Sequence, residues 1–391
     1  MPVQSRATRP TVLRARNAVA AVFAFNGFAM ASWTARIPEA RDALGIAPGQ
    51  LGGLLLGISL GSLAAMPLAG ALVRRFGATS TVSGAAVVNA FGLAGAGIAA
   101  AAGQYWLTGL GLVVFGLGIG VWDVAMNVEG AAVEHGLGRT IMPRFHAMFS
   151  FGTVVGAMVG AGAAAVGVPL WVHLIIAAIF AAASAASAAP GFLPAHSEQQ
   201  SGSRPSMRAW IEPRTLVIGL MVLALALTEG TANDWLAVAL VDGYDAPAWL
   251  GAVGFAVFLS AMTAGRTLGT GLLDRFGRQP VIWATMATAL VGVLLVVFAP
   301  WLPLAVLGAA IWGLGASLGF PVGMSAAADD PERAAARVSV VSTIGYTAFL
   351  AGPPLLGYLG DHFGTLHSLL VVAVLLVPSA MAVPAAEPPR R

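Results

Sequence analysis

A small number of polar and ionisable side chains interrupt stretches of this sequence that are otherwise apolar. Glu229 lies near the middle of the apolar run 214–241, and Asn233 follows it four residues later. If the run is helical, both side chains share one face. A carboxylate can take up and release a proton, and an amide can hydrogen-bond a small solute. We interpret Glu229 as a proton-titrating group and Asn233 as its solute-binding neighbour, with a structural hydrogen bond to another helix as the alternative.

Further polar residues occupy similar places. Asp234 lies nearer the end of the same run and about 100° around the helix, so an outer gate, a cap and a solute contact are equally open. Asp123 lies within the run 105–130, and Asn127 follows it on the same face. Asn26, in the run 17–35, adds a further hydrogen-bonding side chain.

Aromatic and basic residues complete the candidate set. Trp122 and Trp312 lie deep in their runs, where an indole can stack on a sugar or another flat ligand or simply fill the core. His146 can accept a proton near neutral pH or act as a hydrogen-bonding spacer. Arg266 lies about two helical turns inside the run 249–273, and an ordinary ion pair with Asp274 is its simplest interpretation.

No pattern indicates an enzyme, a cofactor or a metal. The chain has no Cys, and its six His residues lack metal-ligand spacing. No phosphate-binding G-x-x-x-x-G-K-[ST] loop occurs, and no nucleophile, base and orienting group can be assembled from the spacing. The net charge is +3, but no basic block interleaved with aromatic residues is present. We therefore expect neither an enzyme nor a nucleic-acid-binding protein.

The elements that position these residues must lie in a lipid bilayer. Of the 391 residues, 58% are apolar and 9% are charged. A soluble protein carries about 25% charged residues. The mean hydropathy is +0.83. These values predict a polytopic membrane protein.

Charged residues, Pro and Gly divide the chain into twelve apolar runs of about 20 residues, each long enough to cross the hydrocarbon core. They cover 17–35, 50–73, 79–101, 105–130, 141–166, 168–189, 214–241, 249–273, 280–299, 301–324, 337–360 and 365–385. With both termini cytoplasmic, nearly all Arg residues fall on the cytoplasmic side, and Arg36 and Arg41 fall outside. The basic N-terminus and Ala29-Met30-Ala31 also fit a cleaved signal peptide, but we interpret the first run as an uncleaved helix.

The two halves of the chain repeat each other. Arg74-Arg75-Phe76-Gly77 and Asp274-Arg275-Phe276-Gly277 occupy equivalent loops, and Phe115-Gly116-Leu117-Gly118 matches Trp312-Gly313-Leu314-Gly315. We therefore expect two six-helix bundles around a central site. The predicted segments are a tail over 1–16, a bundle over 17–189, a linker over 190–213, a bundle over 214–385 and a tail over 386–391. Glycines repeat every fourth residue at 152–160, which is typical of close or sliding helix contacts.

The loop Leu272-Leu273-Asp274-Arg275-Phe276-Gly277-Arg278 resembles the G-x-L-x-D-R-x-G-R-R signature of the major facilitator superfamily. The stretches 127–134, 229–235 and 352–357 resemble a bacterial inner-membrane branch that is loosely similar to fucose-type sugar permeases. The resemblance implies an all-α integral membrane protein of the major facilitator fold, with twelve transmembrane helices in two pseudo-symmetric six-helix bundles.

The resemblance also implies roles for the candidate residues. In this family the first, fourth, seventh and tenth spans line the cavity, which would direct Asp123 inward as a coupling or gating group. The eighth span meets the fifth, so Arg266 would bridge to Asp123 or His146 when the cytoplasmic side closes. Asp274, with Arg275 beside it, would form the family's loop latch, whereas Arg74 replaces the equivalent Asp in the first half.

The function that this resemblance implies is secondary active transport of a small solute by alternating access. We expect proton-coupled uptake of a polar metabolite such as a sugar, by a monomer in the bacterial inner membrane. Drug exporters of the family carry a Gly-Pro pair in the fifth span, but Ala157 follows Gly156 here. A proton-driven efflux antiporter and a transport-inactive membrane sensor remain the alternatives.

Overall fold

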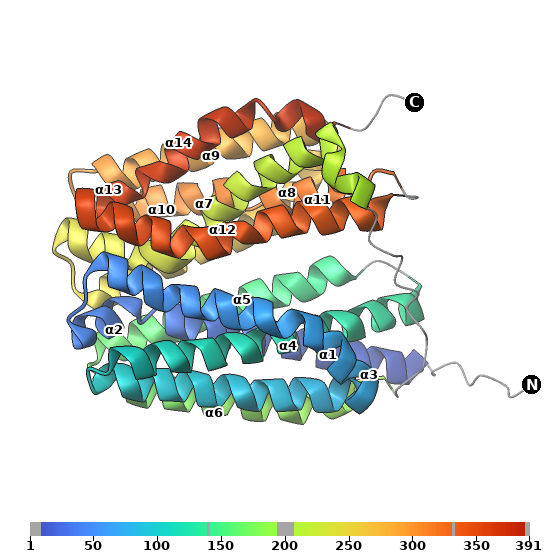
Figure 1. The fold of residues 1–391 in the computed structure, drawn as a ribbon, viewed down its shortest axis with the longest axis horizontal. Coiled ribbons are helices and arrows are strands. Elements are labelled where there is room, and N and C mark those ends of the chain that lie inside the picture. Colours follow the sequence, from blue (N-terminus) through green and yellow to red (C-terminus); the bar gives the residue numbers. More distant parts are fainter. Residues whose placement is uncertain (1–8, 139–140, 194–206, 331–332, 388–391) are drawn as a thin grey trace, which may run out of the picture. The chain divides into compact units, whose positions relative to one another are not determined.

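The structure is a computed structural model that describes residues 9–138, 141–193, 207–330 and 333–387. Over these ranges it contains helices and no strand, so the predicted all-α class is confirmed (Figure 1). Ten helical segments within these ranges are long and apolar enough to cross a membrane, and the helical stretch Thr365–Ala380 is apolar but shorter. The longest segment bends and supplies two of the predicted crossings.

The first half of the chain is made of long helices joined by short turns. They are α1 (Arg9–Thr34), α2 (Ile37–Leu44), α3 (Pro48–Ala101), α4 (Tyr105–Leu137), α5 (Met142–Ala165) and α6 (Leu170–Ala188), followed by a 3-10 turn over Ala189–Gly191. Gly77 interrupts α3 with φ 79° and ψ 160°, a conformation that side chains with a Cβ disfavour. The bend separates the predicted runs 50–73 and 79–101.

The second half begins with a 3-10 turn over Met207–Ile211 and ends with another over Val383–Ala386. Its helices are α7 (Pro213–Tyr244), α8 (Ala248–Phe276), α9 (Arg278–Phe298), α10 (Leu302–Ala316), α11 (Gly319–Ala327), α12 (Ala334–Phe363), α13 (Thr365–Ser368) and α14 (Leu370–Ala380). The predicted run 301–324 is therefore two helices, because the chain breaks at Ser317 and Leu318. This break carries part of the candidate site.

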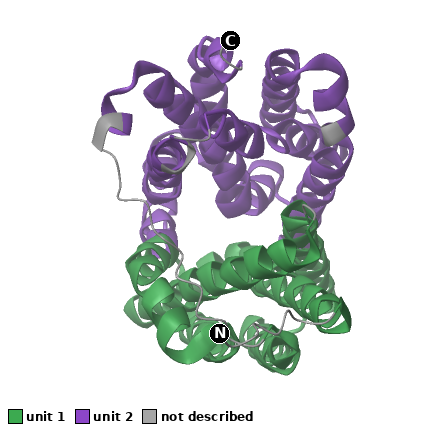
Figure 2. Cartoon of the chain, turned by 90° about the vertical axis from the view of Figure 1, so that its right-hand side faces the viewer, with its two compact units in different colours: residues 1–45, 57–199 green, residues 46–56, 200–391 purple. Residues whose placement is uncertain are grey.

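The chain forms two compact units (Figure 2). The first comprises residues 1–45 and 57–199, and the second comprises 46–56 and 200–391. The start of α3 thus belongs to the second unit and the rest of α3 to the first.

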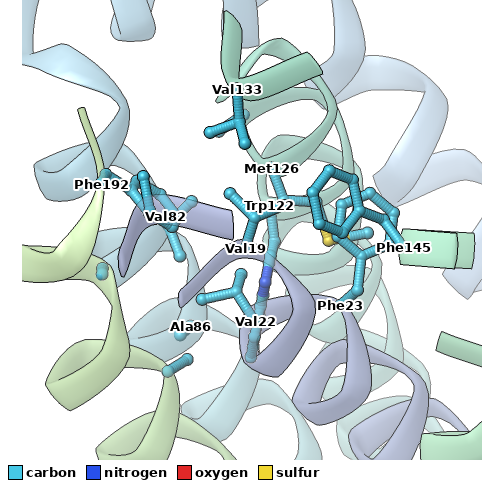
Figure 3. Close-up of a cluster of buried hydrophobic side chains, with 14 of the residues drawn as sticks. Val19, Val22, Phe23, Val82, Ala86, Trp122, Met126, Val133, Phe145 and Phe192 are labelled. Carbon is cyan, nitrogen blue, oxygen red and sulfur yellow. The ribbon is translucent and has the colours of Figure 1, made fainter. Parts of the chain in front are cut away.

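The core of the first unit joins α1, α3, α4 and α5 (Figure 3). Phe23 stacks on Phe145 with ring centroids 5.7 Å apart, and Trp122 is fully buried beside them. Glycines let α1 and α5 approach closely, because a Cβ at Gly152 would lie 1.9 Å from the carbonyl oxygen of Ala24. The glycine repeat of α5 thus permits close packing against α1 within this unit.

The predicted repeat recurs in the turns. The guanidinium of Arg75 lies 5.5 Å from the ring centroid of Phe76, and Arg275 lies 5.1 Å from that of Phe276. Gly277 has φ 80°, like Gly77. The sequence analysis missed a third copy of this turn, Asp361-His362-Phe363-Gly364, in which Gly364 has φ 81°.

Candidate functional site

An intramembrane ion pair joins α7 to α8 in the second unit. Nη2 of Arg266 donates to Oε1 of Glu229 at 2.9 Å and to Oε2 at 2.8 Å. The side chains remain 27% and 18% exposed, so the pair is not sealed in the core of the second unit. Sequence reasoning found both residues but did not pair them. Their opposite charges, each inside an apolar run of the same half, were the available signal.

The same arginine reaches the break between α10 and α11. Its Nε donates to the carbonyl oxygen of Ser317 at 3.2 Å. Carbonyl groups in the last turn of a helix lack intrahelical partners, and α10 ends at Ala316. Gly265 makes room for this approach, because a Cβ there would lie 2.5 Å from Oγ of Ser317. Arg266 therefore links α7, α8 and the α10–α11 break through one side chain.

A small pocket lies between α7 and α12, and its α7 lining runs from two residues before Glu229 to six residues after it. From α7 it is lined by Leu227, Gly230, Thr231, Asp234 and Trp235, and from α12 by Ala348, Phe349, Gly352 and Pro353. Oγ1 of Thr231 and Nε1 of Trp235 are buried and have no hydrogen-bond partner among the described residues. Two of the side chains that line this pocket thus have unused hydrogen-bonding capacity.

Asn233, the predicted partner of Glu229, is half-buried on α7. The carboxylate of Glu229 is bound by Arg266 instead, and no hydrogen bond joins it to Asn233 within the described ranges. Glu229 and Asn233 thus keep their i and i+4 spacing on α7 without a hydrogen bond between them, and Asp234 lines the pocket.

The predicted pair on α4 does meet. Nδ2 of Asn127 donates to the backbone oxygen of Asp123 at 2.8 Å and to its Oδ1 at 3.3 Å. Both side chains are half-buried within the first unit. On α1, Asn26 is 2% exposed, and its Nδ2 has no partner among the described residues. In the first unit, Asp123 thus has Asn127 as its hydrogen-bond donor, whereas the buried amide of Asn26 is separate from this pair.

The two candidate stacking residues lie in the cores of their units. Trp122 and Trp312 are both fully buried, and Trp312 meets Phe258 edge to face with centroids 5.6 Å apart. Neither indole presents a free ring face to a solute in this structure, so core packing accounts for both.

Apart from the partly buried Arg266, the predicted gating residues lie at exposed positions. His146 is exposed and meets the ring of Phe23 edge-on, with centroids 5.2 Å apart. Asp274 is exposed and has no hydrogen bond or ion pair among the residues that the structure describes, and Arg275 lies over Phe276. The bridge from Arg266 to Asp123 or His146 and the Asp274 latch therefore stay predictions.

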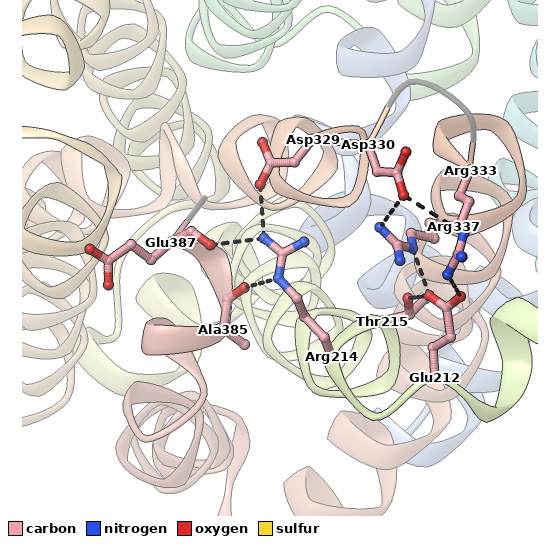
Figure 4. Close-up of polar contacts among 9 residues, drawn as sticks. All are labelled: Glu212, Arg214, Thr215, Asp329, Asp330, Arg333, Arg337, Ala385 and Glu387. Atoms are coloured by element: carbon pink, nitrogen blue, oxygen red, sulfur yellow. Dashed lines mark hydrogen bonds and ion pairs between the residues drawn. The ribbon is translucent and has the colours of Figure 1, made fainter. Parts of the chain in front are cut away.

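A charge cluster that the sequence analysis did not predict gathers where α7 begins (Figure 4). Asp329 is 8% exposed and accepts from Nη2 of Arg214 at 2.8 Å. It also accepts from Nη1 of Arg278 at 2.6 Å. Glu212 accepts from Nε of Arg337 at 2.6 Å, and this hydrogen bond holds the pKa of the Glu212 carboxyl below its ordinary value. The cluster ties the loop after α11 to the start of α7.

The described residues contain no group of three or more His, Cys, Asp or Glu side chains placed to hold a metal ion. The polar groups above are instead suited to exchanging protons and to hydrogen-bonding an organic solute.

Comparisons with known proteins agree with this architecture. The model of the Major Facilitator Superfamily matches residues 18–353 and 250–391. An uncharacterised transporter of Sinorhizobium fredii is 32% identical over 346 residues, which is 88% of this chain and 90% of that protein. An uncharacterised MFS-type transporter of Yersinia pestis is 29% identical over 92% of both chains.

Solved structures share the fold at low sequence identity. The nucleoside transporter NupG superposes with a TM-score of 0.78 and 16% identity, covering 96% of this chain and 99% of that chain. The E. coli fucose:proton symporter FucP superposes with a TM-score of 0.64 and 16% identity, over the same shares of the two chains.

Proposed function

Since this chain belongs to the major facilitator superfamily, we propose that it is a secondary active transporter that takes up a small polar metabolite together with protons. It works by alternating access as a monomer in the bacterial inner membrane, with both termini cytoplasmic. The observation that carries the proposal is the ion pair inside the membrane-spanning region, in which Nη2 of Arg266 donates to both carboxylate oxygens of Glu229.

A proton acts on this pair directly. Protonation of Glu229 removes the negative charge that holds the guanidinium of Arg266, and a charge within the bilayer needs a partner. Arg266 also donates a hydrogen bond to Ser317 at the α10–α11 break. Loss of the negative charge on Glu229 therefore weakens the contact between α7 and α8 and allows the Arg266 side chain to change its contact with this break. Proton uptake at Glu229 is thereby coupled to helix rearrangement, as a symporter requires.

We favour the hypothesis that the protein takes up a sugar-like solute over the hypothesis that it exports one. Two proteins of similar structure are a nucleoside transporter and a fucose:proton symporter, which supports a hydroxyl-rich solute. Ala157 stands where drug exporters of the family have Pro, which disfavours efflux. A proton-driven exporter and a transport-inactive sensor are the alternatives that an experiment must separate.

Counterflow in proteoliposomes over a library of small solutes tests the proposal. We expect exchange of at least one polar solute, and accumulation of that solute when an inward pH gradient is imposed. Glu229→Gln should keep exchange and lose gradient-driven accumulation. The matched control is Asp245→Asn, which makes the same acid-to-amide change at an exposed position after α7. Absence of flux for every solute overturns transport and favours the sensor.

A further inference from the structure

We propose that the pocket beside Asp234 binds a protonated amine carried by the transported solute. This inference rests on the proposed function, because it names the chemical class of the solute. The pocket is formed by α7 and α12 of the second unit alone.

The first argument is charge balance along α7. Glu229 is neutralised by Arg266, and Asp242 accepts a hydrogen bond from Thr365 at 2.6 Å. Asp234 lies between them, ten residues before the last residue of α7 at Tyr244 and therefore about 15 Å from that end. It has no hydrogen bond or ion pair among the described residues. A carboxylate at such depth is costly unless it binds a proton or a positive group accompanies it.

The second argument comes from neighbouring polar atoms. Thr231 is 3% exposed and Trp235 is 1% exposed, and both line the same pocket as Asp234. Their Oγ1 and Nε1 atoms have no partner in the described part of the chain. Buried polar groups in native proteins are almost always hydrogen-bonded. The Trp235 N–H can donate to an oxygen of a solute, and the Thr231 hydroxyl can donate or accept.

The pocket walls select the kind of cation. Phe349 packs against Gly230, where a Cβ would lie 3.3 Å from two ring carbons, so the glycine leaves space for the ring. Leu227 and Ala348 add further apolar surface. An aromatic ring beside a carboxylate is suited to an organic ammonium group, because the ring face attracts a cation that has lost its water.

The surroundings are unsuitable for the other partners of a carboxylate. A bare metal ion requires several oxygen ligands, and only one carboxylate faces this pocket. A neutral sugar can use Thr231 and Trp235 but leaves the charge of Asp234 uncompensated. A solute with one amine and neighbouring hydroxyl groups uses all three side chains.

The test is ligand-dependent thermal stability of the purified full-length protein. Matched amine and hydroxyl compounds serve as probes: D-glucosamine with D-glucose, ethanolamine with ethylene glycol, and putrescine with 1,4-butanediol. A ligand that binds the folded state raises the unfolding temperature according to its concentration and affinity. We expect at least one amine to raise the unfolding temperature, and the matched hydroxyl compound to raise it far less.

Variants locate the effect. Asp234→Asn should weaken amine binding by about tenfold to a hundredfold, the value of one charged hydrogen-bond partner. Asp245→Asn, an equal change of charge at an exposed site, should leave amine binding unaltered. Thr231→Val keeps every charge and should weaken binding less than Asp234→Asn, which provides a second measurement if the first variant does not fold.

Any of three results would overturn the inference. No amine stabilises the protein, the matched hydroxyl compound stabilises it as much as the amine does, or the Asp234→Asn variant binds the amine as tightly as the wild type. The proposed function is judged separately. Proton-driven flux of a neutral solute that needs no amine would refute the amine pocket and leave the transporter assignment standing.

Discussion

The carboxylate of Asp361, near the end of α12, accepts a hydrogen bond from the backbone N–H of Gly49 in the first turn of α3 at 3.0 Å. The first N–H groups of a helix have no intrahelical partner, and the helix dipole favours an anion at that end. Residues 46–56 belong to the second unit through such contacts, whereas the rest of α3 belongs to the first. Asp361 therefore holds the segment at which the chain passes between units.

Removal of this charge should loosen the start of α3. Asp361→Ala should lower the free energy of unfolding by about 0.3–1 kcal/mol, the usual value of an acid at a helix N-terminus. Asp361→Asn keeps an oxygen acceptor and should lower the free energy of unfolding by less. Thermal unfolding in detergent, or amide hydrogen exchange at residues 49–52, measures the effect. Equal losses for both variants would show that the charge of Asp361, and not its accepting oxygen, carries the effect, and no loss for either would show that the contact with Gly49 contributes nothing.

Close packing between α3 and α12 gives a second prediction. A Cβ at Gly52 would lie 2.4 Å from the backbone oxygen of Pro353, and backbone yields less readily than a side chain. Gly52→Ala should therefore destabilise the protein by about 1–3 kcal/mol, the usual cost of overpacking. Gly84→Ala is the control, because a Cβ there meets nothing within 4 Å and alanine favours helix. Similar unfolding temperatures for the two variants would contradict the contact.

A double-mutant cycle tests the ion pair. Arg266→Ala leaves Glu229 as an uncompensated carboxylate, and Glu229→Gln leaves Arg266 without its anion. Breaking a buried pair costs about 3–5 kcal/mol, and we expect about 1–3 kcal/mol here because the side chains are 27% and 18% exposed. The double variant should lose less than the sum of the single losses. Additive losses in thermal unfolding would show that the two residues act independently.

A second cycle addresses the bridge that the sequence predicts for another stage of transport. Arg266→Ala combined with Asp123→Ala should reduce counterflow less than the product of the two single effects if Arg266 reaches Asp123 during the cycle. Comparison of the two cycles shows whether Arg266 interacts with Glu229 in the resting protein and with Asp123 only during transport. Independent effects on the exchange rate would remove Asp123 from the gate.

Residue types and periodicity were enough to predict the helical class and the intramembrane charges, because twenty apolar residues in succession allow few structures and a carboxylate among them stands out. Partner choice was harder. Glu229 and Arg266 are 37 residues apart, so their contact depends on how α7 packs on α8. The roles of Asp329 and Asp361 were missed because each lies at a helix end, where sequence alone indicates only a solvated acid.

The cluster at the start of α7 predicts a pH dependence. Glu212 has a pKa below the ordinary 4.5, chiefly because Arg337 donates a hydrogen bond to it. The folded state thus binds this proton more weakly than the unfolded state. The stability that Glu212 contributes is fully present above pH 4.5 and is lost as the pH falls through the lowered pKa.

Glu212→Gln should therefore flatten the acid limb of a plot of unfolding temperature against pH, with its largest difference from the wild type above pH 4.5 and the smallest at the acid end. Arg337→Gln should act in the same way, because it removes the donor. Arg333→Gln is the weaker comparison, since this side chain is 61% exposed and its nearest contact to Glu212 is 3.4 Å. If Glu212→Gln followed the wild-type curve at every pH, the hydrogen bond from Arg337 would contribute nothing to folding and the acid sensitivity would lie elsewhere.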